Sequence, residues 1–184
     1  ADYIMNEFKK SGLNVEVQTF EIPIPKEMGS WIYIGGPIDL NITAYALWPN
    51  GGLTASIIDN VTGRVQYVGD GALQNLNGID FDDSILLMDF NSGLNWIKAA
   101  ELGAKAVIFI EPAETDRYET LKKGSTAPIN FPRLYVNATS GEILKEAAKK
   151  GLYITLHTEM YWEKSKAYNI IGKLPGKQEH DVII

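Results

Sequence analysis

The sequence predicts an α+β fold, because segments typical of helices and segments typical of strands alternate along it. Three segments share one local order: a helix, a glycine that ends the helix, and a strand. Glycine suits the left-handed backbone conformation just past a helix end, and Gly12, Gly103 and Gly151 stand at these positions. A series of short strands with turn residues between them separates the first of these segments from the second.

Apolar periodicity places the elements of the three segments. The helices are expected at residues 3–11, 95–102 and 140–150, and the strands that follow them at residues 13–20, 105–110 and 152–158. The apolar run at residues 107–110 is continuous, which indicates a strand covered on both faces. Thr139 and Glu142 have the spacing of a capping box, so we expect Thr139 to cap the third helix.

The chain between the first two segments is expected to be mostly β, with strong turn signals at its Gly, Pro, Asn and Asp clusters. The strands are expected at residues 30–34, 42–47, 53–58, 64–68 and 85–89. Residues 111–133 form a long polar stretch that predicts a loop, and loops of that length are often functional. Two last strands are expected at residues 168–174 and 181–184.

Composition excludes several classes of protein. The chain has 184 residues and a formal net charge of −6, which argues against a nucleic-acid module or a protein that binds anionic membranes. It has no cysteine, so disulfides, thiolate zinc sites, iron–sulfur centres and cysteine nucleophiles are excluded. No stretch approaches the 18 or more apolar residues of a membrane-spanning helix. Both ends lack the usual features of a chain terminus, so we expect the sequence to be part of a longer protein.

A search for catalytic motifs finds none, and we predict no catalytic, cofactor-binding or metal-ligating residue in this chain. His157 and His180 have no partner at metal-ligand spacing, and we interpret both as ordinary surface or strand histidines. The Gly69-Asp70-Gly71 sequence lacks the third glycine of a dinucleotide-binding fingerprint and is interpreted as a turn. The acidic run at Asp80, Asp82 and Asp83 lacks the glycine and glutamate of a calcium loop and is interpreted as a solvated turn.

Three Asn-x-Thr sequons could carry glycans, at Asn41, Asn60 and Asn137. Such sequences also arise by chance, so composition leaves glycosylation open. The tryptophans are scattered, and core packing or loop anchoring is the expectation for each of them.

The centre of the chain carries a series of motifs in a characteristic order. They are Val65-Gln66-Tyr67-Val68-Gly69, the acidic turn Ile79-Asp80-Phe81-Asp82-Asp83, the strand at residues 84–89, Ala99-Ala100-Glu101-Leu102-Gly103-Ala104 before the strand at 105–110, and Phe131-Pro132 before a strand and the helix that ends at Gly151. This order resembles a protease-associated domain. The chain departs from that family in having Asp83-Ser84 where Gly-Lys precedes the strand, and Asp89-Phe90 where Arg-Gly follows it.

The flanks resemble a second family. The segment at residues 8–20, Phe-Lys-Lys-Ser-Gly-Leu-Asn-Val-Glu-Val-Gln-Thr-Phe, is similar to the opening helix and first strand of di-zinc aminopeptidases, the family of bacterial leucine aminopeptidases and glutamate carboxypeptidase. Tyr168-Asn169-Ile170-Ile171-Gly172 resembles that family's Asn-Val-Ile-Ala segment. Asp181-Val182-Ile183-Ile184 resembles the strand immediately before its Gly-x-His-x-Asp zinc motif.

These resemblances imply three parts: residues 1–24 and 166–184 from a peptidase domain, and residues 25–165 as a protease-associated domain, an open β-barrel or layered sheet flanked by two helices. They imply a non-catalytic part of a zinc aminopeptidase that covers the active-site cleft, shapes substrate access or mediates association. No cofactor is expected in this chain, and two zinc ions are expected in the parent peptidase domain. The implied partners are that domain, peptide substrates or other proteins. The family favours an extracellular or cell-surface location.

Two alternatives stay open: a stand-alone protein-binding or sorting module, and a receptor-like protein without peptidase activity. We also expect the terminal segments to expose apolar side chains such as Val15, Val17 and Ile170, because they resemble the edge of a larger sheet. The chain is therefore predicted to form a homodimer through these segments at high concentration.

Overall fold

The computed structural model describes residues 1–47, 57–124 and 128–176, and the chain divides into two compact units. The terminal unit joins Ala1–Ile24 to the segment that begins at Trp162. The central unit is Pro25–Tyr161. The sequence placed the corresponding boundaries between residues 24 and 25 and between residues 165 and 166.

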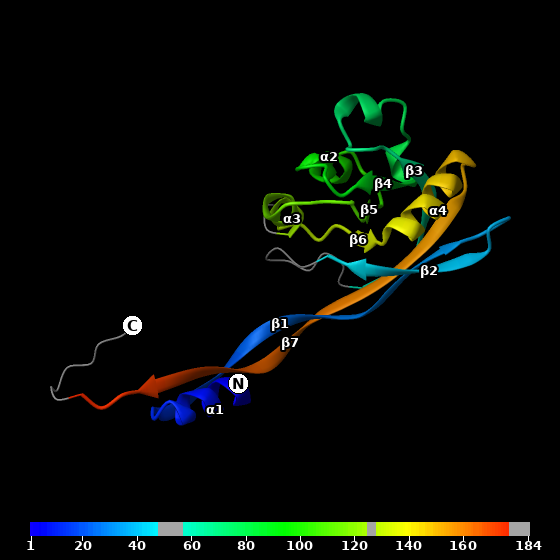
Figure 1. The fold of residues 1–184 in the computed structure, drawn as a ribbon. Coiled ribbons are helices and arrows are strands. Elements are labelled where there is room, and N and C mark those ends of the chain that lie inside the picture. The colour runs from blue at the N-terminus through cyan, green and yellow to red at the C-terminus, as the bar shows by residue number, and fades with distance from the viewer. Residues whose placement is uncertain (48–56, 125–127, 177–184) are drawn as a thin grey trace. The chain divides into compact units, whose positions relative to one another are not determined.

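Four α-helices and seven strands make up the described part of the chain, which confirms the α+β class (Figure 1). The helices are α1 (Asp2–Lys10), α2 (Asn95–Glu101), α3 (Arg117–Gly124) and α4 (Ala138–Lys149). The strands are β1 (Asn14–Ile34), β2 (Leu40–Ala46), β3 (Ile57–Tyr67), β4 (Ser84–Asp89), β5 (Ala106–Ile110), β6 (Arg133–Val136) and β7 (Tyr153–Lys173).

The strands follow the order β1-β2-β6-β5-β4-β3-β7. Within it β3, β4, β5 and β6 run parallel to one another, with Leu86 opposite Val107 and Ile110 opposite Val136. Antiparallel pairs join β1 to β2, β2 to β6 and β3 to β7. The carboxyl ends of β4, β5 and β6 therefore lie at one edge of the sheet.

The core of the central unit has two layers, one on each face of the parallel strands. Ile108 of β5 packs in one layer with Leu144 and Ala147 of α4. Phe109 of the same strand packs in the other layer with Trp96 of α2. All five residues of β5 are buried, which confirms the prediction of a strand covered on both faces. Burial of a side chain of this size stabilises the fold by about 1.5–3 kcal/mol.

The terminal unit contains α1 and the outer parts of β1 and β7. Here β1 and β7 are antiparallel, because residues with higher numbers on β1 contact residues with lower numbers on β7. Gln18 Oε1 accepts a hydrogen bond of 3.0 Å from the Asn169 amide, and Glu16 and Lys173 form a 2.7 Å ion pair. A side chain at Gly172 would collide with Leu13 and Phe8, which explains why α1 can pack closely on this strand.

Two pairs of predicted strands are each one continuous strand in the structure. The strands predicted at residues 13–20 and 30–34 merge into β1, and those predicted at 152–158 and 168–174 merge into β7. Pro23 and Pro25 do not interrupt β1, because proline's fixed φ is compatible with extended backbone. The strand predicted at 53–58 lies mostly outside the described residues, and the strand predicted at 181–184 lies wholly outside them.

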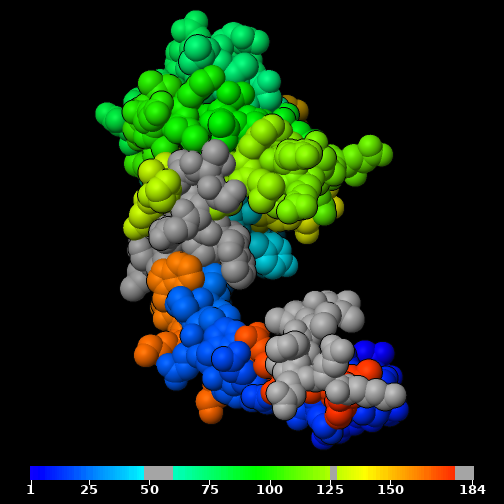
Figure 2. Space-filling view, turned by 90° about the vertical axis from the view of Figure 1, so that its left-hand side faces the viewer, coloured from blue at the N-terminus to red at the C-terminus, as the bar shows by residue number. Residues whose placement is uncertain are grey.

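The prediction of two flanking helices is incomplete, because the central unit also contains α3 inside the predicted loop at residues 111–133. The segment of Figure 2 in yellow-green contains this helix and protrudes from the surface of the unit. Its polar sequence, Arg-Tyr-Glu-Thr-Leu-Lys-Lys-Gly, lacks the apolar face that would have revealed it.

The predicted cap of α4 is also wrong. Asn137, not Thr139, is the N-cap residue, and its Oδ1 accepts a 2.8 Å hydrogen bond from the Ser140 amide. Asn is at least as good a cap as Thr, so the helix begins two residues earlier than predicted.

Candidate functional site

A depression of about 530 Å³ lies where β4 and β5 end and α4 begins. Its lining includes Asp89, Phe90, Glu111, Glu142 and Lys145. The carboxyl ends of parallel strands are a common position for ligands in sheets of this kind, because the chain leaves the sheet there in loops. This depression is the candidate functional site.

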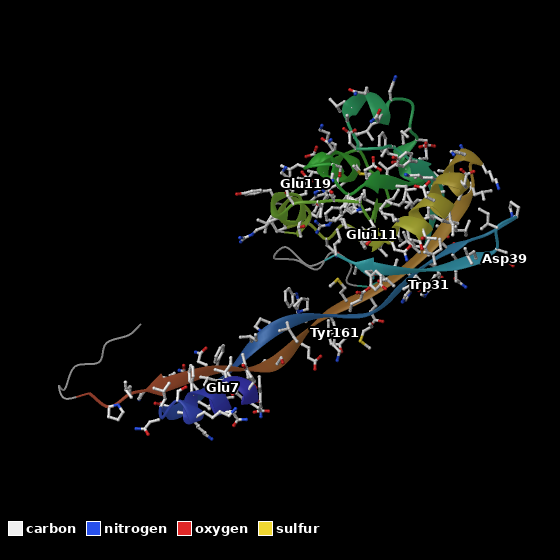
Figure 3. The ribbon with its side chains drawn as sticks, viewed as in Figure 1. Glu7, Trp31, Asp39, Glu111, Glu119 and Tyr161 are labelled. Atoms are coloured by element: carbon white, nitrogen blue, oxygen red, sulfur yellow. The ribbon has the colours of Figure 1, made fainter. Side chains whose placement is uncertain are left out.

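The strand register brings its parts together. Asp89 lies opposite Ile110, and Ile110 lies opposite Val136, so the residues that follow these strands share one edge. Glu111 Oε2 accepts a 3.0 Å hydrogen bond from the backbone amide of Ala138, in the first turn of α4 (Figure 3). A carboxylate at this position also interacts favourably with the positive end of the helix dipole.

A glycine allows α4 to approach β5 at this edge. A Cβ atom at Gly141 would overlap the side chain of Ile110. Gly141 is buried in the first half of α4, where the helix covers the end of the strand. The absence of a side chain at this position therefore sets the distance between the two elements that form the depression.

Hydrogen bonds and an ion pair order the polar side chains. The Tyr67 hydroxyl donates a 2.8 Å hydrogen bond to Asp89 Oδ1, and Lys145 Nζ donates one of 2.8 Å to Glu142 Oε1. The Lys145 ammonium also lies 4.8 Å from the centre of the Tyr67 ring. Burial and then the hydrogen bond to Asp89 raise the pKa of Tyr67, and the hydrogen bond to Glu142 raises the pKa of Lys145. Tyr67 therefore stays neutral and Lys145 stays charged near neutral pH.

Charged side chains determine what the depression can contact. The depression offers three carboxylates and one ammonium group, and His157 is not among its lining residues. Nowhere in the described part of the chain do three His, Cys, Asp or Glu side chains gather closely enough to hold a metal ion. Carboxylates on the rim of an apolar depression favour polar or cationic groups of a partner.

A second polar cluster lies beneath the segment at residues 111–133. Lys123 is only 2% exposed and contacts Glu119 Oε2 at 3.0 Å and the Gly93 carbonyl at 2.8 Å. Burial opposes ionisation of Glu119, but hydrogen bonds from Lys122, Lys123 and the Gly93 amide outweigh it and lower its pKa to about 2.

Arg133 is fully buried beside this cluster. Its Cζ lies 4.2 Å from the centre of the Trp96 ring, and Nη1 donates to the Lys123 carbonyl. Nε and Nη2 have no hydrogen-bond partner in the described structure, and burial lowers the pKa of the guanidinium to about 10. The two buried cations hold α3 against α2 and β6 and serve the packing of this segment.

The residues that the sequence analysis singled out do not assemble into one site. The His157 ring stacks on Trp31 with centroids 5.3 Å apart, and His180 lies outside the described residues. Asp83 accepts a 2.6 Å hydrogen bond from Tyr153 and pairs with Lys105 at 3.0 Å. Asp70 Oδ1 accepts from the Ala72 amide within the predicted turn. These acidic residues therefore stabilise local structure.

The three sequon asparagines lie on exposed positions. Asn41 belongs to β2 and Asn60 to β3, and Asn137 caps α4. All three are therefore reachable, and the question of glycosylation that composition left open stays open.

Sequence reasoning missed the residues of the depression, although one signal was available. Asp89 and Glu111 directly end two predicted buried strands, and Glu142 lies in the first turn of a predicted helix. The rule that polar residues at the carboxyl ends of parallel strands meet would have brought the first two together. It could not be applied because the sequence analysis did not establish that these strands are parallel.

Comparison with known proteins gives a fold but no family at the level of sequence. No family model matches the chain, and no curated protein matches it. Among solved structures, the chain is similar to an aminopeptidase from Aneurinibacillus sp. strain AM-1, with 24% identity and a TM-score of 0.60 over 97% of this chain. It is also similar to a peptidase M28 precursor from Shewanella amazonensis SB2B, with 16% identity and a TM-score of 0.62 over 93% of this chain.

These similarities cover nearly all of this chain but only part of the two peptidases. The chain spans 42% of the length of the first and 43% of the second. It therefore shares its fold with a portion of this aminopeptidase and of this peptidase M28 precursor. In the described part of the chain, no helix is both long and apolar enough to cross a membrane.

Proposed function

We propose that the chain is a non-catalytic, protease-associated part of a zinc aminopeptidase. In this proposal residues 25–165 form the protease-associated domain, and residues 1–24 and 166–184 belong to the peptidase domain. The domain covers the active-site cleft, shapes substrate access or binds a protein partner, and the two zinc ions lie in the peptidase domain.

The observation that supports the proposal most is the match of 97% of this chain to part of the fold of an aminopeptidase. The motif order of the sequence agrees with it, because both flanks resemble aminopeptidase segments and the centre resembles a protease-associated domain. The α+β architecture, with helices on both faces of a parallel set of strands, is consistent with that assignment.

The depression at the ends of β4 and β5 is the surface that we assign to partner contact. It lies at the beginning of the segment at residues 111–133, and Asn91 holds that segment by accepting from Thr115 and donating to the Glu114 carbonyl, both at 2.8 Å. A scaffold that fixes the loops in this way can present Glu111 and Glu142 to the ammonium group of a peptide or to a basic side chain.

The first test is made on the purified chain. It should not hydrolyse leucine p-nitroanilide with or without added zinc, and elemental analysis after dialysis should find no stoichiometric metal. Zinc bound one-to-one together with metal-dependent hydrolysis would overturn the non-catalytic assignment.

The second test uses the reading frame that encodes the chain. A His-x-Asp motif within a few codons after Ile184 would favour the peptidase. A stop codon there would favour a stand-alone protein-binding or sorting module, and a peptidase-like frame without the zinc ligands would favour a receptor-like protein.

If the frame encodes a peptidase, the role of the depression can be measured in the longer enzyme. Glu142→Ala should raise the KM for peptide substrates by more than it raises the KM for leucine p-nitroanilide, since a chromogenic amino acid makes fewer contacts outside the cleft. Glu146→Ala, on the same helix but outside the depression, is the matched control. Equal effects of the two substitutions would argue against substrate access through this surface.

A further inference from the structure

A second depression, of about 660 Å³, lies on the outward face of the sheet in the central unit. Its lining is Trp31 and Tyr33 of β1, Asn41 of β2, Asn60 of β3 and Thr155 of β7. It shares no lining residue with the first depression, and we call it the aromatic groove.

The alternation of β1 explains the two aromatic side chains. Ile32 and Ile34 are fully buried in the core, so Trp31 and Tyr33 point to the opposite face. Each ring is held in place: Trp31 stacks on His157 with an interplanar angle of 11°, and the Tyr33 hydroxyl donates a 2.8 Å hydrogen bond to Asp39. Figure 3 shows Trp31 on β1 and Asp39 at the tip of the β1–β2 hairpin. Because the rings are already fixed, binding of a ligand on them costs little side-chain entropy of the protein.

Two amide side chains complete the groove. Asn41 lies directly opposite Tyr33 in the β1–β2 register. Asn60 has a φ of 56° at a shift in the β3–β7 register, between Ile58 and Val61. Bulges of this kind turn a side chain out of the regular alternation and often serve a site. Both asparagines are exposed, and within the described residues their side-chain amides make no hydrogen bond, so each can offer a donor and an acceptor to a ligand.

The chemistry of this lining is uncharged. Two aromatic rings, two amides and the Thr155 hydroxyl, which shares a 2.8 Å hydrogen bond with Thr62, form the groove. A polyanion would need cationic side chains here, and a charged peptide would need an opposite charge. Sugar rings present an apolar C–H face and a rim of hydroxyl groups. Aromatic rings pack against such a face, and amides hydrogen-bond to vicinal hydroxyls.

From this match we propose that the aromatic groove binds a neutral saccharide chain, laid across β1 with sugar rings on Trp31 and Tyr33 and hydroxyl groups on Asn41 and Asn60. The two rings stand two residues apart on one strand, about 6.6 Å along its axis, so they can contact adjacent sugars. The proposal does not depend on the peptidase assignment, because every residue that it uses belongs to the central unit.

Calorimetric titration with cellotetraose, xylotetraose and chitotetraose tests the proposal. The chain should be produced in a host that does not glycosylate proteins, so that the sequons at Asn41 and Asn60 remain free. At least one tetrasaccharide should bind saturably with a millimolar or tighter Kd. The absence of saturable binding by all three at millimolar concentrations would overturn the proposal.

Variants locate the binding. Trp31→Ala should weaken it at least tenfold. Trp162→Ala removes an exposed tryptophan from the terminal unit and should leave the affinity unchanged. Asn60→Gly keeps the left-handed backbone and removes the amide, so it should weaken binding several-fold without loss of stability.

A folding control accompanies these variants. Since Trp31→Ala also removes the stack on His157, its thermal unfolding should be measured, and Trp31→Phe should retain part of the affinity. Wild-type affinity in both Trp31→Ala and Asn60→Gly, or an equal loss in Trp162→Ala, would contradict binding in the aromatic groove.

Discussion

Lys123 Nζ lies 3.0 Å from Glu119 Oε2, one turn apart on α3, and the lysine is among the most buried side chains of the protein. The same ammonium lies 5.4 Å from the centres of the Phe90 and Phe109 rings. A charge in such surroundings is tolerated only while its partner is present, because the apolar neighbours cannot solvate it. Both members of the pair also bond to the backbone of Gly93, at 3.0 Å from the Gly93 amide to Glu119 and 2.8 Å from Lys123 to the Gly93 carbonyl, and these bonds join α3 to the segment before α2.

Replacement of Glu119 tests this relationship. Glu119→Gln should lower the free energy of unfolding by about 1–3 kcal/mol, because it leaves the Lys123 charge buried without a counter-ion. Glu146→Gln breaks an exposed pair with Lys149 on α4 and should change stability by less than about 0.5 kcal/mol. Urea unfolding of the two variants gives the comparison. A loss in Glu119→Gln no larger than in Glu146→Gln would mean that the buried pair does not stabilise the fold.

The same ion pair predicts a pH dependence. The pKa of Glu119 is about 2 in the folded protein against an ordinary value of 4.5, so the folded state binds the proton less well than the unfolded state. Its contribution is fully present above pH 4.5 and is lost as the pH falls from 4.5 towards 2. Between pH 7 and pH 3 the wild type should lose about 1–2 kcal/mol more than Glu119→Gln, after allowance for solvent screening. Parallel stability–pH curves for the two proteins would contradict the low pKa.

The contact of Gly141 with Ile110 predicts that replacement of this helical glycine by alanine lowers the stability of the protein. Alanine is the better helix former by about 1 kcal/mol, yet Gly141→Ala should destabilise the protein by about 1–3 kcal/mol because its Cβ overlaps Ile110. Thermal unfolding measures the loss. The added substitution Ile110→Ala removes the Cγ1 and Cγ2 atoms at the contact, so the double variant should be more stable than the sum of the single effects. Strict additivity would show that the two side chains do not compete for the same space.

Two substitutions can distinguish between the candidate N-cap residues of α4, Asn137 and Thr139. Asn137→Ala removes the side chain that accepts from the Ser140 amide and should cost about 1 kcal/mol of stability. Thr139→Ala, the residue that the capping-box spacing favoured, should change stability by less than about 0.5 kcal/mol. Chemical unfolding of the two variants decides between them, and the reverse order of effects would restore Thr139 as the cap.

The helices α3 and α4 show how far structure can be predicted from the local sequence. The periodicity of α2 and α4 and the apolar run of β5 identified elements correctly, because burial on one face leaves a pattern in the sequence. The boundary at Asn137 was missed because Asn137 and Thr139 are both good caps and only the contact made in the fold selects one. The polar helix α3 was missed for a related reason: buried polar contacts with Gly93 and Arg133 hold it, rather than an apolar face.

Features that depend on contacts between distant parts of the sequence could be identified only in the structure. The two strands predicted at residues 13–20 and 30–34 are one strand in β1, since strand continuity depends on the neighbouring strand rather than on local propensity. The depression depends on Asp89, Glu111 and Glu142, which are far apart in sequence and meet through the parallel register of β4 and β5. The aromatic groove likewise joins side chains of four strands. Motif order indicated the class of fold, but no pattern in the sequence specified these juxtapositions.

The last prediction concerns the terminal unit. Val17, Phe20 and Ile22 of β1 are each between 37% and 41% exposed, and Ile171 of β7 is 38% exposed. An antiparallel ribbon that leaves so many apolar side chains in water gains free energy by pairing with a second copy. Light scattering should therefore show dimers that increase with protein concentration, as the sequence analysis predicted.

A substitution on this ribbon provides the test. Phe20→Lys should raise the dissociation constant of the dimer at least tenfold, because it places a charge in the apolar contact. Tyr45→Lys, at a similarly exposed aromatic position of the central unit, should leave the dimer unchanged. If the wild type remains monomeric up to millimolar concentration, the exposed side chains of the terminal unit do not act as an interface between copies. If instead Tyr45→Lys dissociates the dimer as strongly as Phe20→Lys, the contact involves the central unit.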